Sequence, residues 1–131
     1  MKKKILFVDD DPGILMVGDM LLKSLGYEVL AAGSGREAID IIKNSESKID
    51  FIFLDFMMPG LDGSDVLIFM RESGIKIPVV VQTGIISDSD LNAVKKLGAI
   101  DCICKPYSKQ DLRDAIAKMV EFTASYLLPE Q

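Results

Sequence analysis

The chain contains no histidine among its 131 residues. Its own side chains therefore provide no imidazole to act as a general base, to bind a metal ion or to carry a phosphoryl group on nitrogen. Any reactive site built from this chain must rely on carboxylates, hydroxyls, lysines or thiols.

Cysteine is also scarce, since Cys102 and Cys104 are the two in the chain. Two residues apart on a strand, their side chains point to the same face, and a disulfide at that spacing would be strained. We expect two reduced thiols that pack as small hydrophobic groups. A zinc site is disfavoured, because the sequence offers no second cysteine pair and no histidine.

The chain lacks both an excess of positive charge and long apolar runs. Its net charge of −5 argues against direct nucleic-acid binding, which needs a basic face to meet phosphates. The apolar run after the N-terminal lysines ends after four residues, at the acidic segment 9–11. That run is too short for a secretion signal or a membrane-spanning helix, so we expect a cytoplasmic protein without membrane insertion. The length predicts one domain.

Short apolar runs alternate with helix-forming segments along the sequence. Apolar runs predict strands, and cap residues with helical spacing predict helices. Strands that are apolar on both faces are typical of parallel sheets. The alternation therefore predicts an α/β fold, a doubly wound five-stranded parallel sheet with five helices and right-handed crossovers. The expected strands are 3–8, 27–31, 49–54, 77–81 and 100–104, and the expected helices are 12–25, 35–43, 64–72, 90–97 and 109 to nearly 129.

Polar side chains follow four of these apolar runs. Asp9–Asp10, Asp55, Thr83 and Lys105 each come at the carboxyl end of an expected strand. In an open α/β sheet these ends meet at one edge, where ligands bind. Carboxylates suit a hard divalent cation, while a hydroxyl and an ammonium suit phosphoryl oxygens. The pattern predicts a phosphoryl site with a metal ion.

Each of these residues also has a simpler interpretation. Asp9–Asp10 repel each other unless a cation neutralises them, but an acidic loop before a helix cap explains the pair equally well when it is taken alone. Asp55 either starts a turn or is a nucleophile that forms an acyl phosphate. Thr83 is ordinarily structural and Lys105 ordinarily solvated. However, Pro106 favours an extended Lys105 that can reach over the sheet edge to Asp55.

Taken together, the motifs resemble those of the response regulator receiver domain. The similarity spans residues 3–122 and rests on four segments: 5–12 (ILFVDDDP), 54–63 (LDFMMPGLDG), 81–84 (VQTG) and 104–107 (CKPY). It implies a flavodoxin-like fold with strand order 2-1-3-4-5. Residues 123–131 are then expected to form a C-terminal extension of the last helix and a tail.

The resemblance also implies a role for each candidate residue. Asp55 would be the phosphoacceptor, Lys105 would bind the phosphoryl group, and Thr83 would move inward to form a hydrogen bond with it. Mg²⁺ would be held by Asp9, Asp10, Asp55 and the backbone carbonyl of Met57.

The same resemblance implies a phosphoryl donor and an output. A sensor histidine kinase or a histidine phosphotransfer protein would supply the phosphoryl group. The face of the fourth helix, fifth strand and fifth helix would then switch, to control a downstream protein or an output domain outside this chain. No enzyme activity is expected beyond self-phosphotransfer and autodephosphorylation.

Two alternatives stay open at this point. One is a receiver-like module that binds partners without phosphorylation. The other is a small aspartate-nucleophile phosphatase, which would carry a second acid at the position of Met57.

Two positions depart from the pattern of the family. Cys102 stands where many receivers carry a Tyr or Phe that moves together with Thr83, so the aromatic half of the switch is in question. Gln82 is polar where apolar residues are common, and is expected either to contact the switch loop or to face solvent at the strand end. Residues 124–128 add apolar surface, which predicts contact with a partner helix or, in a homodimer formed on phosphorylation, with a second copy.

Overall fold

A computed structural model describes residues 2–44, 48–84 and 87–127. Within them, strands and helices alternate, and the strands form one parallel sheet in the order β2-β1-β3-β4-β5. This is the expected doubly wound α/β architecture. The elements are β1 (Lys4–Val8), α1 (Pro12–Ser24), β2 (Glu28–Ala32), α2 (Gly35–Lys43), β3 (Phe51–Asp55), α3 (Gly63–Glu72), β4 (Val79–Thr83), α4 (Asp88–Lys96), β5 (Asp101–Cys104) and α5 (Lys109–Leu127).

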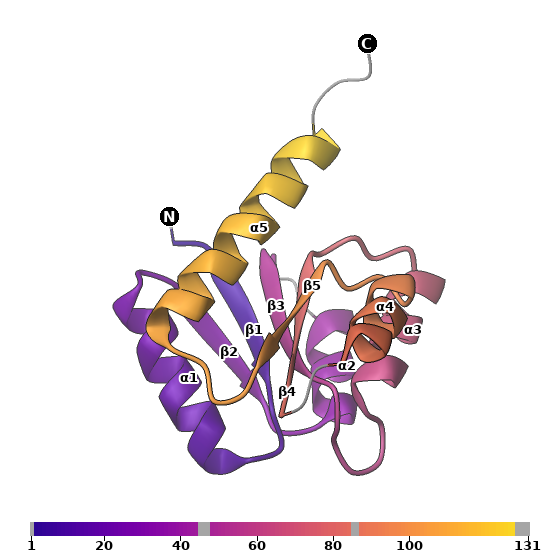
Figure 1. Ribbon diagram of the computed structural model, residues 1–131, viewed down its shortest axis with the longest axis horizontal. Coiled ribbons are helices and arrows are strands. Elements are labelled where there is room, and N and C mark those ends of the chain that lie inside the picture. Colours follow the sequence, from indigo (N-terminus) through magenta and orange to yellow (C-terminus); the bar gives the residue numbers. More distant parts are fainter. Residues whose placement is uncertain (1, 45–47, 85–86, 128–131) are drawn as a thin grey trace.

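The sheet separates α1 and α5 from α2, α3 and α4 (Figure 1). A hydrophobic cluster lies on each side of it. On one side, which we call the α2–α4 face, buried side chains of α2, α3 and α4 pack against the sheet. On the other side, the α1–α5 face, buried residues of α1 and α5 do the same. Side chains along a strand alternate between the faces. In β4, Val79 and Val81 belong to the α2–α4 face and Val80 to the α1–α5 face.

Three strands end one or two residues later than the apolar runs predicted. β3 includes Asp55 and β4 includes Thr83, because hydrogen-bonded pairing continues in register through these polar residues. β4 also begins at Val79 rather than at residue 77. Pro78 has no N–H to donate, although its carbonyl accepts a hydrogen bond from the Ile52 N–H at 3.1 Å.

The helices begin at residues whose side chains accept backbone hydrogen bonds. Asp11 accepts from the N–H groups of Gly13 and Ile14, at 2.8 and 3.3 Å, and so caps α1 beside the end of β1. The last turns of α5 extend past the sheet (Figure 1). The expected continuation toward residue 129 lies outside the described residues. Among the helices that are described, none is both long and apolar enough to cross a membrane.

Gly63 brings the start of α3 against the end of β3. A Cβ at this position would lie 2.6 Å from the carbonyl oxygen of Asp55 and 2.8 Å from the Cα of Phe56. The Gly63 N–H also donates to the Phe56 carbonyl at 3.0 Å. The absence of a side chain at residue 63 therefore allows α3 to lie this close to the backbone that carries Asp55.

Both cysteines are free thiols, as expected, but they are not packed alike. Cys102 is half-buried and packs against the α2–α4 cluster. Cys104 is exposed, with its Sγ 3.5 Å from the carbonyl oxygens of Gly84 and Lys105. The expectation of two packed thiols is therefore wrong for Cys104, because this residue ends a strand at the edge of the sheet.

Candidate functional site

Three carboxylates gather at the carboxyl ends of β1 and β3. One oxygen atom from each of Asp9, Asp10 and Asp55 lies within 4.8 Å of the other two. Asp9 is fully buried and Asp55 is 2% exposed, whereas Asp10 is exposed to solvent. The parallel strands thus bring together acids that are more than forty residues apart in the sequence.

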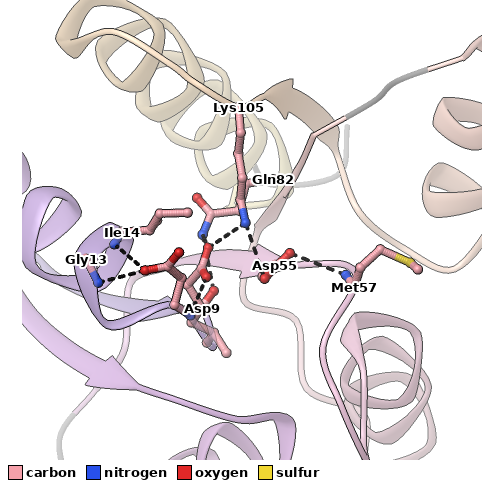
Figure 2. Close-up of polar contacts among 9 residues, drawn as sticks. Asp9, Gly13, Ile14, Asp55, Met57, Gln82 and Lys105 are labelled. Carbon is pink, nitrogen blue, oxygen red and sulfur yellow. Dashed lines mark hydrogen bonds and ion pairs between the residues drawn. The ribbon is translucent and has the colours of Figure 1, made fainter.

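Lys105 extends from the end of β5 into this acidic group (Figure 2). Its Nζ lies 2.7 Å from Asp9 Oδ2 and 3.3 Å from Asp55 Oδ2. The Lys105 N–H donates to the Thr83 carbonyl at 2.7 Å, and the peptide bond to Pro106 is cis. The lysine that the sequence placed near Asp55 therefore contacts it, and contacts Asp9 more closely.

Backbone N–H groups orient the two buried carboxylates. The Asp11 N–H donates to Asp9 Oδ1 at 2.9 Å, so the turn into α1 holds that oxygen. The Met57 N–H donates to Asp55 Oδ1 at 3.3 Å. In each case one oxygen is tied to the local backbone and the other faces Lys105.

The electrostatics of the site are dominated by crowded acids. Burial, and next the charge of Asp9, raise the pKa of Asp55 to about 6, against the opposing effect of Lys105. Burial lowers the pKa of Lys105, but its contacts with Asp9 and Asp55 outweigh burial and raise that pKa overall. With Asp10 included, the group contains three carboxylates and one ammonium, so negative charge is in excess.

Gln82 is a residue of this site that the sequence analysis placed elsewhere. It is fully buried, and its Nε2 donates to Asp9 Oδ2 at 3.1 Å and to the Val8 carbonyl at 3.2 Å. The expectation that Gln82 faces solvent is therefore wrong. Its described hydrogen bonds go to the end of β1 rather than to the loop after Thr83, part of which lies outside the described residues. Gln82 pairs with Asp55 in register and lies on the same face as Val80 by alternation. This alternation was the sequence signal that could have placed Gln82 on the α1–α5 face.

The other half of the Gln82 amide has no partner among the described residues. Its Oε1 is buried and accepts no hydrogen bond there. An unpaired buried acceptor of this kind costs about 1–3 kcal/mol. The Tyr107 hydroxyl is likewise buried without a partner in that part of the chain, and burial, followed by the charges of Asp9 and Asp55, raises the pKa of Tyr107 well above its usual range.

Thr83 and Cys102 lie together on the α2–α4 face at the same end of the sheet. Thr83 is half-buried. The two side chains line a hollow of about 480 Å³ together with Phe56, Val81 and Val94. The hollow lies where an aromatic side chain at position 102 would add volume. Burial, with a smaller contribution from Asp101, raises the pKa of the Cys102 thiol to about 11, so the thiol stays protonated at neutral pH.

The donor set fits a hard divalent cation. Carboxylate oxygens are the preferred ligands of such ions, and the excess negative charge of Asp9, Asp10 and Asp55 over Lys105 matches a charge of two. The Met57 backbone lies beside Asp55 through its N–H contact, which puts its carbonyl within the same turn.

Comparison with known proteins decides the family. The family model for the response regulator receiver domain matches residues 5–117. This chain belongs to the response regulator receiver domain family. Receiver domains are signalling domains of two-component systems and are generally not enzymes. They generally bind Mg²⁺ at an acidic pocket, and they interact with histidine kinases or phosphotransfer proteins and with output domains.

Individual relatives agree with this assignment. The receiver domain is 32% identical over 118 residues to sporulation initiation phosphotransferase F from Bacillus subtilis, covering 90% of this chain and 94% of that protein. A receiver domain protein from Clostridium thermocellum has a solved structure with a TM-score of 0.86 at 31% identity, covering 95% of this chain and 99% of that one. The transcription factor SKN7 from Chaetomium thermophilum is 29% identical over 98% of this chain, which spans 16% of the length of SKN7.

Proposed function

We propose that this receiver domain accepts a phosphoryl group on Asp55. The observation that carries the proposal is the position of Lys105, whose ammonium contacts both Asp55 and Asp9. The carboxylate of the exposed Asp10 lies close to these two acids. Asp55 offers a carboxylate oxygen at the end of a fully buried strand, and its second oxygen accepts a hydrogen bond from the Met57 N–H. A buried acid surrounded in this way is suited to meet a phosphoryl group.

The donor is a phosphohistidine on a sensor histidine kinase or on a histidine phosphotransfer protein. This chain has no histidine to supply one, and the relative from Bacillus subtilis is named as a phosphotransferase. A carboxylate oxygen of Asp55 forms a bond to phosphorus while the phosphorus–nitrogen bond to the donor imidazole breaks. The electron pair remains on that nitrogen, and Asp55 becomes an acyl phosphate.

Asp9, Asp10, Asp55 and the Met57 carbonyl hold Mg²⁺ in this proposal. The bound ion supplies charge neutralisation for the phosphoryl oxygens. In this proposal the Lys105 ammonium moves from Asp9 toward the same oxygens, which are strong acceptors. It already lies 3.3 Å from Asp55, the residue that carries the phosphoryl group. Asp9 keeps its contacts with the Asp11 N–H and with Gln82.

In this proposal, Thr83 transmits the effect of phosphorylation to the rest of the domain. We infer that its hydroxyl moves toward the phosphoryl group and that the face of α4, β5 and α5 changes with it. The hollow beside Thr83 and Cys102 gives this motion space, without an aromatic ring at residue 102. The change controls a downstream protein or an output domain outside this chain.

We assign residues 3–122 to the receiver domain and residues 123–131 to the extension of α5 and the tail. Val120 and Phe122 on α5 are 49% and 40% exposed, which supports contact of this region with a partner helix or with a second copy on phosphorylation. The net charge of −5 supports action through proteins rather than through direct nucleic-acid binding.

Incubation with acetyl phosphate and Mg²⁺, followed by intact-mass measurement, tests the proposal. We expect the mass of one phosphoryl group on the wild type and none on Asp55→Asn. Equal labelling of both proteins, or no labelling of the wild type, would contradict it. Multiple turnover of a phosphate ester would instead favour a phosphatase.

A further inference from the structure

Gln82 bridges two strands that are not neighbours in the sheet. It belongs to β4, and β3 lies between β4 and β1. Its side chain nevertheless passes the end of β3 to donate to Val8 and Asp9, which are 74 and 73 residues away in the sequence (Figure 2). Both atoms it meets are acceptors, so the N–H₂ end of the amide must face them.

Burial of this amide does little for the core itself. Gln82 is fully buried, yet its Oε1 has no hydrogen-bond partner within the described residues. An apolar side chain of similar size would fill the same space without that unpaired oxygen. Core packing therefore does not explain why residue 82 carries an amide. The N–H₂ group of this amide donates to the carboxylate of Asp9 in the site.

Three donors hold the Asp9 carboxylate in place. Oδ1 accepts from the Asp11 N–H at 2.9 Å, and Oδ2 accepts from both Lys105 Nζ at 2.7 Å and Gln82 Nε2 at 3.1 Å. Of the two side chains on Oδ2, Lys105 is the one that the proposed function moves to the phosphoryl group. Gln82 is fixed by its second bond to the Val8 carbonyl.

We propose that Gln82 is a positioning residue for the metal site. It orients the Asp9 carboxylate toward the shared cation, and it leaves a donor on Asp9 Oδ2 when Lys105 turns to the phosphoryl group. This inference rests on the proposed function, in which Asp9 is a Mg²⁺ ligand. Outer partners of metal ligands of this kind typically change metal affinity by roughly 10- to 100-fold when they are removed.

Gln82→Met tests the inference, because methionine has nearly the same length and volume but no N–H₂. A calorimetric titration with Mg²⁺, in the absence of any phosphoryl donor, measures the affinity of the protein for the metal ion. We expect roughly 10-fold weaker Mg²⁺ binding and a correspondingly slower labelling by acetyl phosphate. Thermal stability in metal-free buffer is expected to be unchanged or higher, because the substitution also removes the unpaired Oε1.

Gln110→Met is the matched control. Gln110 also donates to an aspartate, at 2.8 Å to Asp114 Oδ1, but on the exposed surface of α5. Its Mg²⁺ affinity is expected to equal that of the wild type. If Gln82→Met binds Mg²⁺ as tightly as this control, the inference is overturned. If the wild type and the control bind no Mg²⁺ at all, the proposed function itself fails.

The wild-type protein provides a second measurement that does not depend on the folding of a variant. The side-chain amide of Gln82, assigned in an NMR spectrum, is expected to shift on addition of Mg²⁺, because its partner Asp9 becomes a metal ligand. The amide of Gln110 is expected to stay unchanged. A Gln82 amide that does not shift while backbone signals of the site do would overturn the inference.

Discussion

The Lys105 ammonium lies closer to the carboxylate of Asp9 than to that of Asp55, the proposed phosphoacceptor. The Nζ–Oδ2 distance is 2.7 Å to Asp9 and 3.3 Å to Asp55. The ammonium therefore neutralises part of the negative charge that a cation would meet. Under the proposed function, Lys105 and Mg²⁺ would compete for the same carboxylate oxygens before a phosphoryl group arrives.

Lys105→Met is expected to strengthen Mg²⁺ binding while it weakens reaction with a phosphoryl donor. Removing the ammonium frees oxygens of Asp9 and Asp55, so the dissociation constant for Mg²⁺ is expected to fall several-fold. Labelling by acetyl phosphate is expected to slow by roughly 100- to 1000-fold, because one donor to the developing charge is lost. Calorimetry and intact mass measure the two effects, with Lys23→Met on the surface of α1 as control. Weaker Mg²⁺ binding by Lys105→Met would contradict the competition.

Asp55→Asn is expected to stabilise the metal-free protein as well as to prevent phosphorylation. Asp55 is buried near Asp9, and its ionised form is disfavoured by both burial and that charge. A neutral amide removes this repulsion, for a gain on the order of 1 kcal/mol in the free energy of unfolding. Thermal unfolding without Mg²⁺ measures the gain. Asp40→Asn, on the exposed surface of α2, should leave stability unchanged; a lower midpoint for Asp55→Asn would be the opposite of what the crowding predicts.

Gly63→Ala is expected to disturb the acceptor through the backbone. The new methyl group would meet the Asp55 carbonyl at 2.6 Å, so either α3 or the end of β3 must move. We expect a loss of about 1–3 kcal/mol in the free energy of unfolding and slower phosphorylation. Gly33→Ala is the control, because a Cβ there would lie 3.7 Å from the Glu37 carboxylate, an ordinary contact. Equal stability of the two variants would show that the close approach at residue 63 is unimportant.

Thr83→Val is expected to separate acceptance of the phosphoryl group from its readout. Valine keeps the shape of threonine without the hydroxyl, so Asp55 should still be labelled. The phosphorylation-induced chemical-shift changes in α4 and β5 are expected to shrink, because the proposed hydrogen bond is absent. Thr123→Val removes a hydroxyl that bonds to the Met119 carbonyl within α5 and should leave those changes intact. Full-size changes in Thr83→Val would exclude Thr83 as the sensor.

The ion pair of Asp101 and Lys118 is expected to make part of the stability depend on pH. Burial opposes ionisation of Asp101, but hydrogen bonds from Lys118 and the Cys102 N–H outweigh it and lower the pKa below 3.8. A pKa that is lower in the folded state gives stability that is complete above about pH 5 and is lost as the pH falls through the folded value. Asp101→Asn is expected to cost about 0.5–1 kcal/mol at pH 7.

Urea denaturation from pH 7 to pH 2 measures that dependence. The difference between wild type and Asp101→Asn is expected to shrink as the pH falls below the pKa of the unfolded carboxyl, near 3.8, and to close below the lower pKa of the folded protein. Asp40→Asn provides the baseline for an exposed acid. A difference that is the same at pH 2 as at pH 7 would mean that Asp101 contributes through packing rather than through its charge.

The strand-end residues were predictable because of a rule of topology. The carboxyl ends of parallel strands meet at one edge, so Asp9, Asp55 and Lys105 could be grouped without knowing any distance. The exact ends of β3 and β4 were not predictable in the same way. They depend on pairing between Asp55 and Gln82 and between Thr83 and Cys104, which are contacts between distant segments.

The burial of Gln82 was not predictable from the sequence. The alternation of side chains along β4 indicates the face on which Gln82 lies, but it does not separate exposure from burial at the end of the strand. Its environment is decided by Asp9, which is 73 residues away and two strands across the sheet. Cys104 shows the opposite error. It belongs to an apolar run and was expected to be packed, but it is exposed because it lies on the edge strand β5.

The last two residues of β4 point to opposite faces of the sheet. Gln82 contacts Asp9 among the acids, and Thr83 lines the hollow with Val94 of α4. Under the proposed function, two neighbours in the chain therefore have separate roles on opposite faces of the sheet. Substitution of Gln82 would change metal binding and the rate of phosphorylation, and substitution of Thr83 would change the response of α4 and β5. The two properties could then be altered independently at adjacent positions of one strand.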